Sequence, residues 1–125
     1  MRIISGKFKT RLIKTPSNNS IRPTSDRARE MIFNTLNSLL IKDKKKITGQ
    51  AIIDCFCGTG ALGIEALSRG AEQVTFIDSS NESLNLCRKN CQELKIIQNV
   101  KIVKLDIIKD KFPNIDELTL SGGCA

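Results

Sequence analysis

The sequence predicts an α/β fold in which about three parallel strands alternate with helices, preceded by a basic N-terminal hairpin and helix. Residues 47–106 alternate short apolar runs with helical segments, the order of a parallel sheet with right-handed crossovers. Glycines directly follow the first apolar run, and 12 of the 20 Lys and Arg residues precede it. We therefore divide the chain into a basic segment, residues 1–46, and a partial α/β domain, residues 47–125.

The basic segment is predicted to contain an arm and a helix. Residues 1–24 combine two small apolar pieces with a central glycine and a polar loop, which indicates a short hairpin or an extended arm. Residues 25–41 have helical spacing of their apolar side chains, and polar residues that can cap a helix stand at its start. The apolar residues expected on its buried face are Ala28, Met31, Ile32, Leu36, Leu39 and Leu40.

The second segment supplies the sheet. Three strands are predicted, over residues 51–54, 74–77 and 100–105. The first lacks polar alternation, as is usual for buried parallel strands. A short helix is predicted over residues 61–69, where Gly70 ends it. A second helix follows the middle strand, and its inward face is expected to carry Leu84, Cys87, Cys91 and Leu94.

Charge is distributed unevenly along the chain. Residues 1–50 hold 12 basic and three acidic side chains, a net charge of +9, whereas residues 51–125 have a net charge of −2. A basic front indicates a polyanionic partner, most simply a nucleic acid, although such charges can also serve only solubility. No apolar run approaches the ~20 residues of a membrane span, and the N-terminus lacks a secretory signal pattern. We expect a monomeric cytoplasmic protein without membrane contact.

The five cysteines indicate no metal site. They are odd in number, lack the spacing of a disulfide framework and have no histidine to complete a zinc site. We expect them to act as small buried apolar residues in a reducing compartment.

Residues 54–60 form the candidate ligand-binding turn between the first strand and its helix. Gly58 and Gly60 would let the backbone approach a ligand closely, and the amides that begin the helix offer unpaired donors. In open α/β sheets, ligands bind at the carboxyl ends of the strands. The same glycines could instead serve only the geometry of a tight turn.

Acidic residues at the ends of all three predicted strands favour a ligand. Asp54, Asp78 and Asp106 would line one crevice as acceptors for an amine, a ribose and an adenine, in that order. A dinucleotide is the rival, because Gly58, Gly60 and Gly63 match its G-x-G-x-x-G pattern. However, the Asp54 carboxylate would repel a pyrophosphate, whereas it would attract the sulfonium and ammonium groups of S-adenosylmethionine.

Three segments resemble the RsmD family, whose members methylate a guanine exocyclic amine in small-subunit ribosomal RNA. They are Asp54–Ala71, Met1–Lys9 and the R-P-T-x-D-R block of residues 21–34, which is the most specific of the three. The resemblance implies a Rossmann-like S-adenosylmethionine-dependent methyltransferase sheet and, as partner, 16S ribosomal RNA or the small ribosomal subunit.

The resemblance also implies roles for matching residues. The cofactor-binding residues would be Asp54, Gly58, Thr59 and Gly60 at the methionine end, Asp78 at the ribose and Asp106 at the adenine amine. The cations expected to face RNA phosphates are Lys7, Lys9, Arg11, Arg22, Arg27 and Arg29. Phe56 and Leu62 are expected to pack in the protein rather than to contact a ligand.

One family motif has no counterpart in this sequence. The family carries an Asn/Asp-Pro-Pro-Tyr/Phe segment that orients the target amine and stacks on its base, but this chain has no Pro-Pro pair, no Tyr and no Trp. We therefore name no catalytic residue and expect the chain to be truncated before that motif. Two alternatives stay open: a non-catalytic RNA-binding or cofactor-binding remnant, and a DNA adenine amino-methyltransferase relative, against which the R-P-T-x-D-R block speaks.

Overall fold

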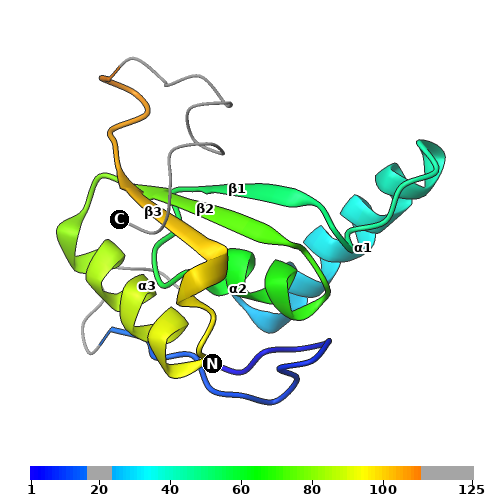
Figure 1. Cartoon of the computed structure of the whole chain (residues 1–125), viewed down its shortest axis with the longest axis horizontal. Coiled ribbons are helices and arrows are strands. Elements are labelled where there is room, and N and C mark those ends of the chain that lie inside the picture. The colour runs from blue at the N-terminus through cyan, green and yellow to red at the C-terminus, as the bar shows by residue number, and fades with distance from the viewer. Residues whose placement is uncertain (17–23, 111–125) are drawn as a thin grey trace.

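The computed structural model describes residues 1–16 and 24–110, and these form one sheet, three α-helices and an N-terminal arm. Figure 1 shows the arrangement. In chain order the elements are α1 (Asp26–Lys42), β1 (Ala51–Cys55), α2 (Ala61–Ser68), β2 (Gln73–Asp78), α3 (Asn81–Glu93), the 3₁₀ turn η1 (Ile97–Asn99) and β3 (Val100–Lys104).

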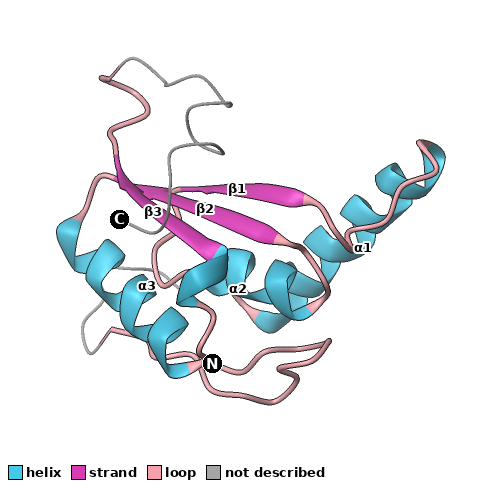
Figure 2. Cartoon of the chain, in the orientation of Figure 1, coloured by secondary structure: helices cyan, strands magenta, loops and turns pink. Residues whose placement is uncertain are grey.

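The three strands are parallel and lie in the order β1-β2-β3. Thr75 in the middle strand is the register partner of Ile53 on one side and of Lys101 on the other. Because both crossovers step in the same direction, α2 and α3 lie on the same side of the sheet, together with the N-terminal arm (Figure 2). The predicted α/β fold with parallel strands is confirmed.

The core lies between the sheet and the two helices that cover it. Ile64, Val74, Phe76 and Cys87 are completely buried there. Gly63 allows α2 to approach β2 closely, because a β-carbon at this position would overlap the ring of Phe76. The apolar runs of the sequence therefore form strands whose side chains are packed mainly against α2 and α3.

Helix α1 begins at Asp26, and the Ser25 side chain caps it by accepting a hydrogen bond from the Ala28 amide. Its buried face differs from the predicted one: the buried residues of the helix are Arg29 and Phe33, whereas Met31 is 62% exposed. The prediction was right for Leu36 and Leu40, which are partly buried against the core. It was wrong for Met31, Ile32 and Leu39, which are exposed, and it missed the arginine that occupies the deepest position on this helix.

The N-terminal arm, residues 1–16, folds back on itself through turns at residues 5–10, and an antiparallel bridge joins Arg2 to Leu12. Of the two predicted forms, a hairpin or an extended arm, the structure has the hairpin-like one. Ile3 and Ile13 insert into the same hydrophobic core as the residues of the sheet and its helices. The Lys7 and Phe8 amides donate to the backbone and hydroxyl oxygens of Ser68 at the end of α2. The arm is thus fixed to α2; the domain division at residue 46 stays a prediction.

Glu65 of α2 is the buried acceptor that joins the arm and α1 to this helix. Its carboxylate accepts hydrogen bonds from the Ile4 amide at 2.9 Å and the Ser5 amide at 3.1 Å. It also accepts from Arg69 Nε at 2.9 Å and from Arg29 Nη1 at 3.4 Å. Two guanidinium groups and two backbone amides therefore share one carboxylate.

Arg29 is part of this buried network and not of the surface. Its side chain is 0% exposed, donates to the Arg2 carbonyl at 2.9 Å and pairs with Asp26. Its Nε has no hydrogen-bond partner among the described residues. The expectation that Arg29 faces RNA phosphates is therefore wrong in this structure, because its guanidinium lies in the core against Glu65.

We predict that Glu65→Gln lowers the free energy of unfolding by about 3–5 kcal/mol, because the buried guanidinium of Arg29 loses its buried counter-charge. Urea denaturation would measure this, with Glu72→Gln as the control because Glu72 is exposed on the protein surface. The double variant Arg29→Met/Glu65→Leu should recover much of the loss, since it removes both charges. Equal stability of Glu65→Gln and the control would contradict the structural role of the network.

Candidate functional site

The glycine loop, residues 56–60, connects β1 to α2 at the carboxyl edge of the sheet. Gly60 precedes the first residue of α2 with a φ of 87°, and a β-carbon there would lie 2.7 Å from Cys87 Sγ. Gly58 also has a positive φ, 55°. Glycine is therefore required at Gly60 by both conformation and space, and the loop presents backbone without side chains at these two points.

Asp54, the penultimate residue of β1, lies at the base of this loop. Its side chain is buried, and Oδ2 accepts a hydrogen bond from the Gly63 amide at 3.0 Å. Burial raises the pKa of Asp54 to about 6; the hydrogen bond from Gly63 lowers it, and the neighbouring charge of Asp78 raises it further. A carboxylate that is costly to ionise in the free protein is stabilised by a cationic ligand.

Asp78 ends β2 and holds the glycine loop in place. Its Oδ2 accepts from the Gly58 amide at 3.0 Å and its Oδ1 accepts from the Ser80 amide at 2.9 Å. The structure thus brings Asp54, Asp78 and the glycine loop together, as their positions at strand ends predicted. Each carboxylate oxygen can accept more than one hydrogen bond, so Asp78 keeps capacity for a ligand hydroxyl.

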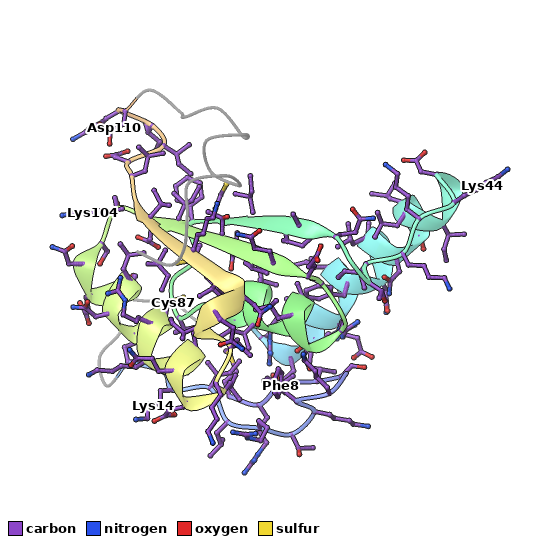
Figure 3. All side chains as sticks on the ribbon, viewed as in Figure 1. Phe8, Lys14, Lys44, Cys87, Lys104 and Asp110 are labelled. Atoms are coloured by element: carbon purple, nitrogen blue, oxygen red, sulfur yellow. The ribbon has the colours of Figure 1, made fainter. Side chains whose placement is uncertain are left out.

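Asp106 lies beyond the end of β3, at the same edge of the sheet, where Figure 3 labels Lys104 and Asp110. The Leu105 amide donates to the Asp78 carbonyl at 3.0 Å, which ties this segment to the end of β2. Asp106 Oδ1 accepts from the Ile108 and Lys109 amides. The carboxylate therefore stabilises its own turn, and an adenine contact stays a prediction.

A small pocket opens between the glycine loop and the residue that precedes α1. It is lined by Thr24, Asp54, Phe56, Cys57, Gly58, Thr59, Ala61 and Leu62. Thr24 is the threonine of the R-P-T-x-D-R block, so the structure places this part of the block beside the candidate ligand site. The sequence motifs gave no sign of this contact, since 30 positions separate Thr24 from Asp54.

Phe56 corrects one expectation. We expected its ring to pack, but it is 65% exposed at the pocket, and its φ of 57° is rare for a residue with a side chain. Leu62, by contrast, packs against the hydrophobic core as expected. Strained, exposed residues are found at functional sites more than elsewhere. Phe56 is therefore a candidate site residue, which the sequence did not indicate because its side chain is apolar.

The predicted RNA-facing cations separate into distinct groups. Lys7, Lys9 and Arg11 are exposed on the N-terminal arm, and Arg27 is exposed on α1. Arg29 is buried, as described above, and Arg22 lies outside the described residues. Lys14, which was not among the predicted cations, is exposed on the same arm, and its Nζ pairs with Glu93 of α3 at 2.7 Å.

Of the four described cysteines, Cys57, Cys87 and Cys91 are buried as expected, whereas Cys55 is exposed and corrects the expectation for that position. The hydrogen bonds of the Cys87 thiol with Cys57 and Cys91, together with burial, raise the pKa of Cys87 far above its ordinary range. Cys87 is therefore a neutral thiol, and the three buried cysteines are part of the packed interior. Within residues 1–16 and 24–110, no group of His, Cys, Asp and Glu side chains has an arrangement that could hold a metal ion. The helices described here are all too short or too polar to cross a membrane.

Comparisons with known proteins show which family and which relatives this chain resembles. The family described as conserved hypothetical protein 95 matches residues 1–117. Ribosomal RNA small subunit methyltransferase D of Escherichia coli K12 is 38% identical over 95 residues, covering 76% of this chain and 44% of that protein. YlbH of Bacillus subtilis, a candidate rRNA methyltransferase by name, is 35% identical over 106 residues, covering 85% of this chain and 54% of its own length.

A solved structure extends the likeness to three dimensions. The candidate methyltransferase yhhF of Escherichia coli is 35% identical and superposes with a TM-score of 0.69, over 85% of this chain and 52% of that one. The chain spans about half the length of the curated relatives it matches.

We predict that Asp54→Asn raises the free energy of unfolding at pH 8 by up to about 3 kcal/mol. It should also remove the part of the pH dependence of stability that comes from the Asp54 carboxyl. The pKa of this buried carboxyl is about 6 against 3.8 when unperturbed, so the folded protein binds the proton more tightly. The wild type should therefore gain stability from this group as the pH falls from 6 to 4. Urea titrations at pH 5 and pH 8 would measure it, with exposed Asp43→Asn as the control. Equal pH dependence in wild type and Asp54→Asn would refute the shifted pKa.

Proposed function

This chain belongs to the RsmD family, described as conserved hypothetical protein 95, and we propose that it binds S-adenosylmethionine and ribosomal RNA for methylation of a guanine N2 amine in 16S ribosomal RNA. The observation that carries the proposal is the convergence of Asp54 and Asp78 on the glycine loop. The name of the Escherichia coli relative, a small-subunit rRNA methyltransferase, supports the substrate.

The cofactor assignment depends on the sign of the charges at the loop. S-adenosylmethionine would supply the methyl group, and its sulfonium and ammonium would lie near Asp54, whose ionisation they would favour. Asp78 would accept from the ribose hydroxyls, and Asp106 from the adenine amine. The backbone of Gly58, Thr59 and Gly60 would face the methionine end. A pyrophosphate in the same place would meet two carboxylates, which argues against a dinucleotide.

The RNA assignment depends on the N-terminal arm. Its exposed cations Lys7, Lys9 and Arg11 project from a segment that is fixed to the body by hydrogen bonds to Ser68 and Glu65. A basic strip on an ordered support suits contact with phosphates, because the charges are held in one arrangement before binding. Lys14 and Arg27 extend the set of exposed cations near the site.

The second candidate is that these 125 residues by themselves bind RNA and the cofactor without catalysing the transfer. The observation in its favour is the absence of any Pro-Pro pair, Tyr or Trp from the 125 residues. The family segment with those residues aligns the target amine, and alignment of reactants can account for several kcal/mol of a barrier.

We predict that the 125-residue chain does not transfer methyl groups, because nothing in its sequence matches the segment that aligns the amine. Radiolabelled methyl transfer to under-methylated small ribosomal subunits would test this, with a longer family member as the positive control. Incorporation by the 125-residue chain would refute the second candidate and place catalysis in residues named here.

For the cofactor, we predict binding of S-adenosylmethionine and no binding of NAD in isothermal calorimetry. Asp78→Asn should weaken the affinity by about tenfold or more, because the ribose hydroxyls and the Gly58 amide lose a charged acceptor. Exposed Asp43→Asn is again the matched control. Unchanged affinity in Asp78→Asn would exclude the ribose role, and NAD binding would favour the dinucleotide rival.

For RNA, we predict that log affinity for structured 16S rRNA transcripts falls linearly with log salt concentration. Replacing Lys7, Lys9 and Arg11 by Gln should flatten the slope by about one unit per lost phosphate contact. The control replaces Lys44, Lys45 and Lys46 by Gln: it removes the same charge, but from the far end of α1, where Figure 3 labels Lys44. Equal slopes for the two triple variants would mean that the arm contributes only net charge.

A further inference from the structure

Asn90 of α3 contacts both elements to which the proposed function assigns a ligand. Its polar side-chain amide is buried. Oδ1 accepts from the Lys14 amide of the N-terminal arm at 2.8 Å. Nδ2 donates to the Lys14 carbonyl at 3.1 Å and to the Thr59 carbonyl of the glycine loop at 3.0 Å.

The three hydrogen bonds require an amide at this position. The paired bonds to Lys14 fix the arm in orientation as well as in position, because the side chain donates to and accepts from the same residue. The second amide hydrogen reaches Thr59, between the two glycines of the loop. Aspartate has a similar shape but would turn a carboxylate toward two carbonyl oxygens, and leucine would leave all three backbone groups without this partner.

The rest of the arm is attached to the helix that begins at the same loop. Residues 4–8 are bound to Glu65 and Ser68 of α2. The exposed Lys9 and Arg11 therefore lie between two attachments, one on α2 and one on α3 at Asn90. The arm is bound to α2, and α2 begins at the glycine loop. Asn90 of α3 links the arm directly to that loop by hydrogen bonds to both.

We propose that Asn90 is a positioning residue that couples the RNA-binding arm to the cofactor loop, so that cofactor and RNA each strengthen binding of the other. The inference rests on the proposed function of the two elements. Cofactor contact with the loop would restrain Thr59 and, through Asn90, Lys14. An arm that is already restrained loses less conformational freedom when it binds RNA. Thermodynamic linkage then requires RNA to raise the affinity for the cofactor by the same factor.

The structural half of the proposal can be tested without ligands. Amide hydrogen exchange would be followed at Lys14, whose N–H donates to Asn90, and at Gly60, whose N–H donates to the Cys57 carbonyl within the loop. Asn90→Asp should accelerate exchange at both positions. Asn85→Asp, the same substitution at an exposed site of the same helix, should change neither. Acceleration at only one of the two positions, or at neither, would overturn the link.

The functional half would be tested by calorimetry, which would measure the affinity for S-adenosylmethionine with and without a bound 16S rRNA transcript. In wild type and Asn85→Asp, RNA should tighten cofactor binding about fivefold or more, within the usual range of such couplings. In Asn90→Asp the factor should fall to one. A purely structural role would weaken both ligands but leave the factor unchanged, and that result would overturn the coupling.

Two further outcomes also decide the matter. If wild type binds neither probe, the proposed function fails, while the exchange result still decides whether Asn90 joins arm and loop. If Asn90→Asp is unfolded, Asn90→Ala takes its place, because it removes the bonds without adding a charge. Persistence of the full coupling factor in folded Asn90→Ala would overturn the proposal.

Discussion

A single buried carboxylate organises the described part of this chain. Glu65 accepts from two arginines and from two successive backbone amides of the arm, and none of these donors is close to it in sequence except Arg69. Burying a charge is unfavourable unless it is paired and hydrogen-bonded. The arrangement meets that condition only when the arm, α1 and α2 are all in place, so the charge specifies one relative position for three elements.

The same helix carries the second electrostatic feature of the molecule. α2 begins at Gly60, and the Asp54 carboxylate that accepts from its Gly63 amide lies on the adjacent strand, near the charge of Asp78. Two acids in one crevice repel each other, and the repulsion is relieved by a proton or by a cationic ligand. The proposed site would therefore favour a cationic ligand, while the Gly58 and Gly63 amides are engaged with the protein's own carboxylates.

The β-α-β-α-β order was predictable from sequence because apolar runs and glycine stops are local signals. The positions of Asp54 and Asp78 were predictable for the same reason, since strand ends meet at one edge. Arg29 was not predictable, because its burial depends on Glu65, 36 residues away. The exposure of Phe56 was not predictable either, because an aromatic residue is more often buried and its positive φ has no sequence signal. Asn90 gave no signal, because its partners are backbone groups.

The attachments of the N-terminal arm also set an order of assembly. Its residues bond to partners 60 to 82 positions later in the chain. Contacts of such long range form late and slow the folding of a domain. During synthesis the arm has no docking surface until Asn90 has been made and α2 and α3 have packed on the strands. The arm is therefore made before the elements that hold it, and its basic side chains stay undocked while α2 and α3 are still being translated.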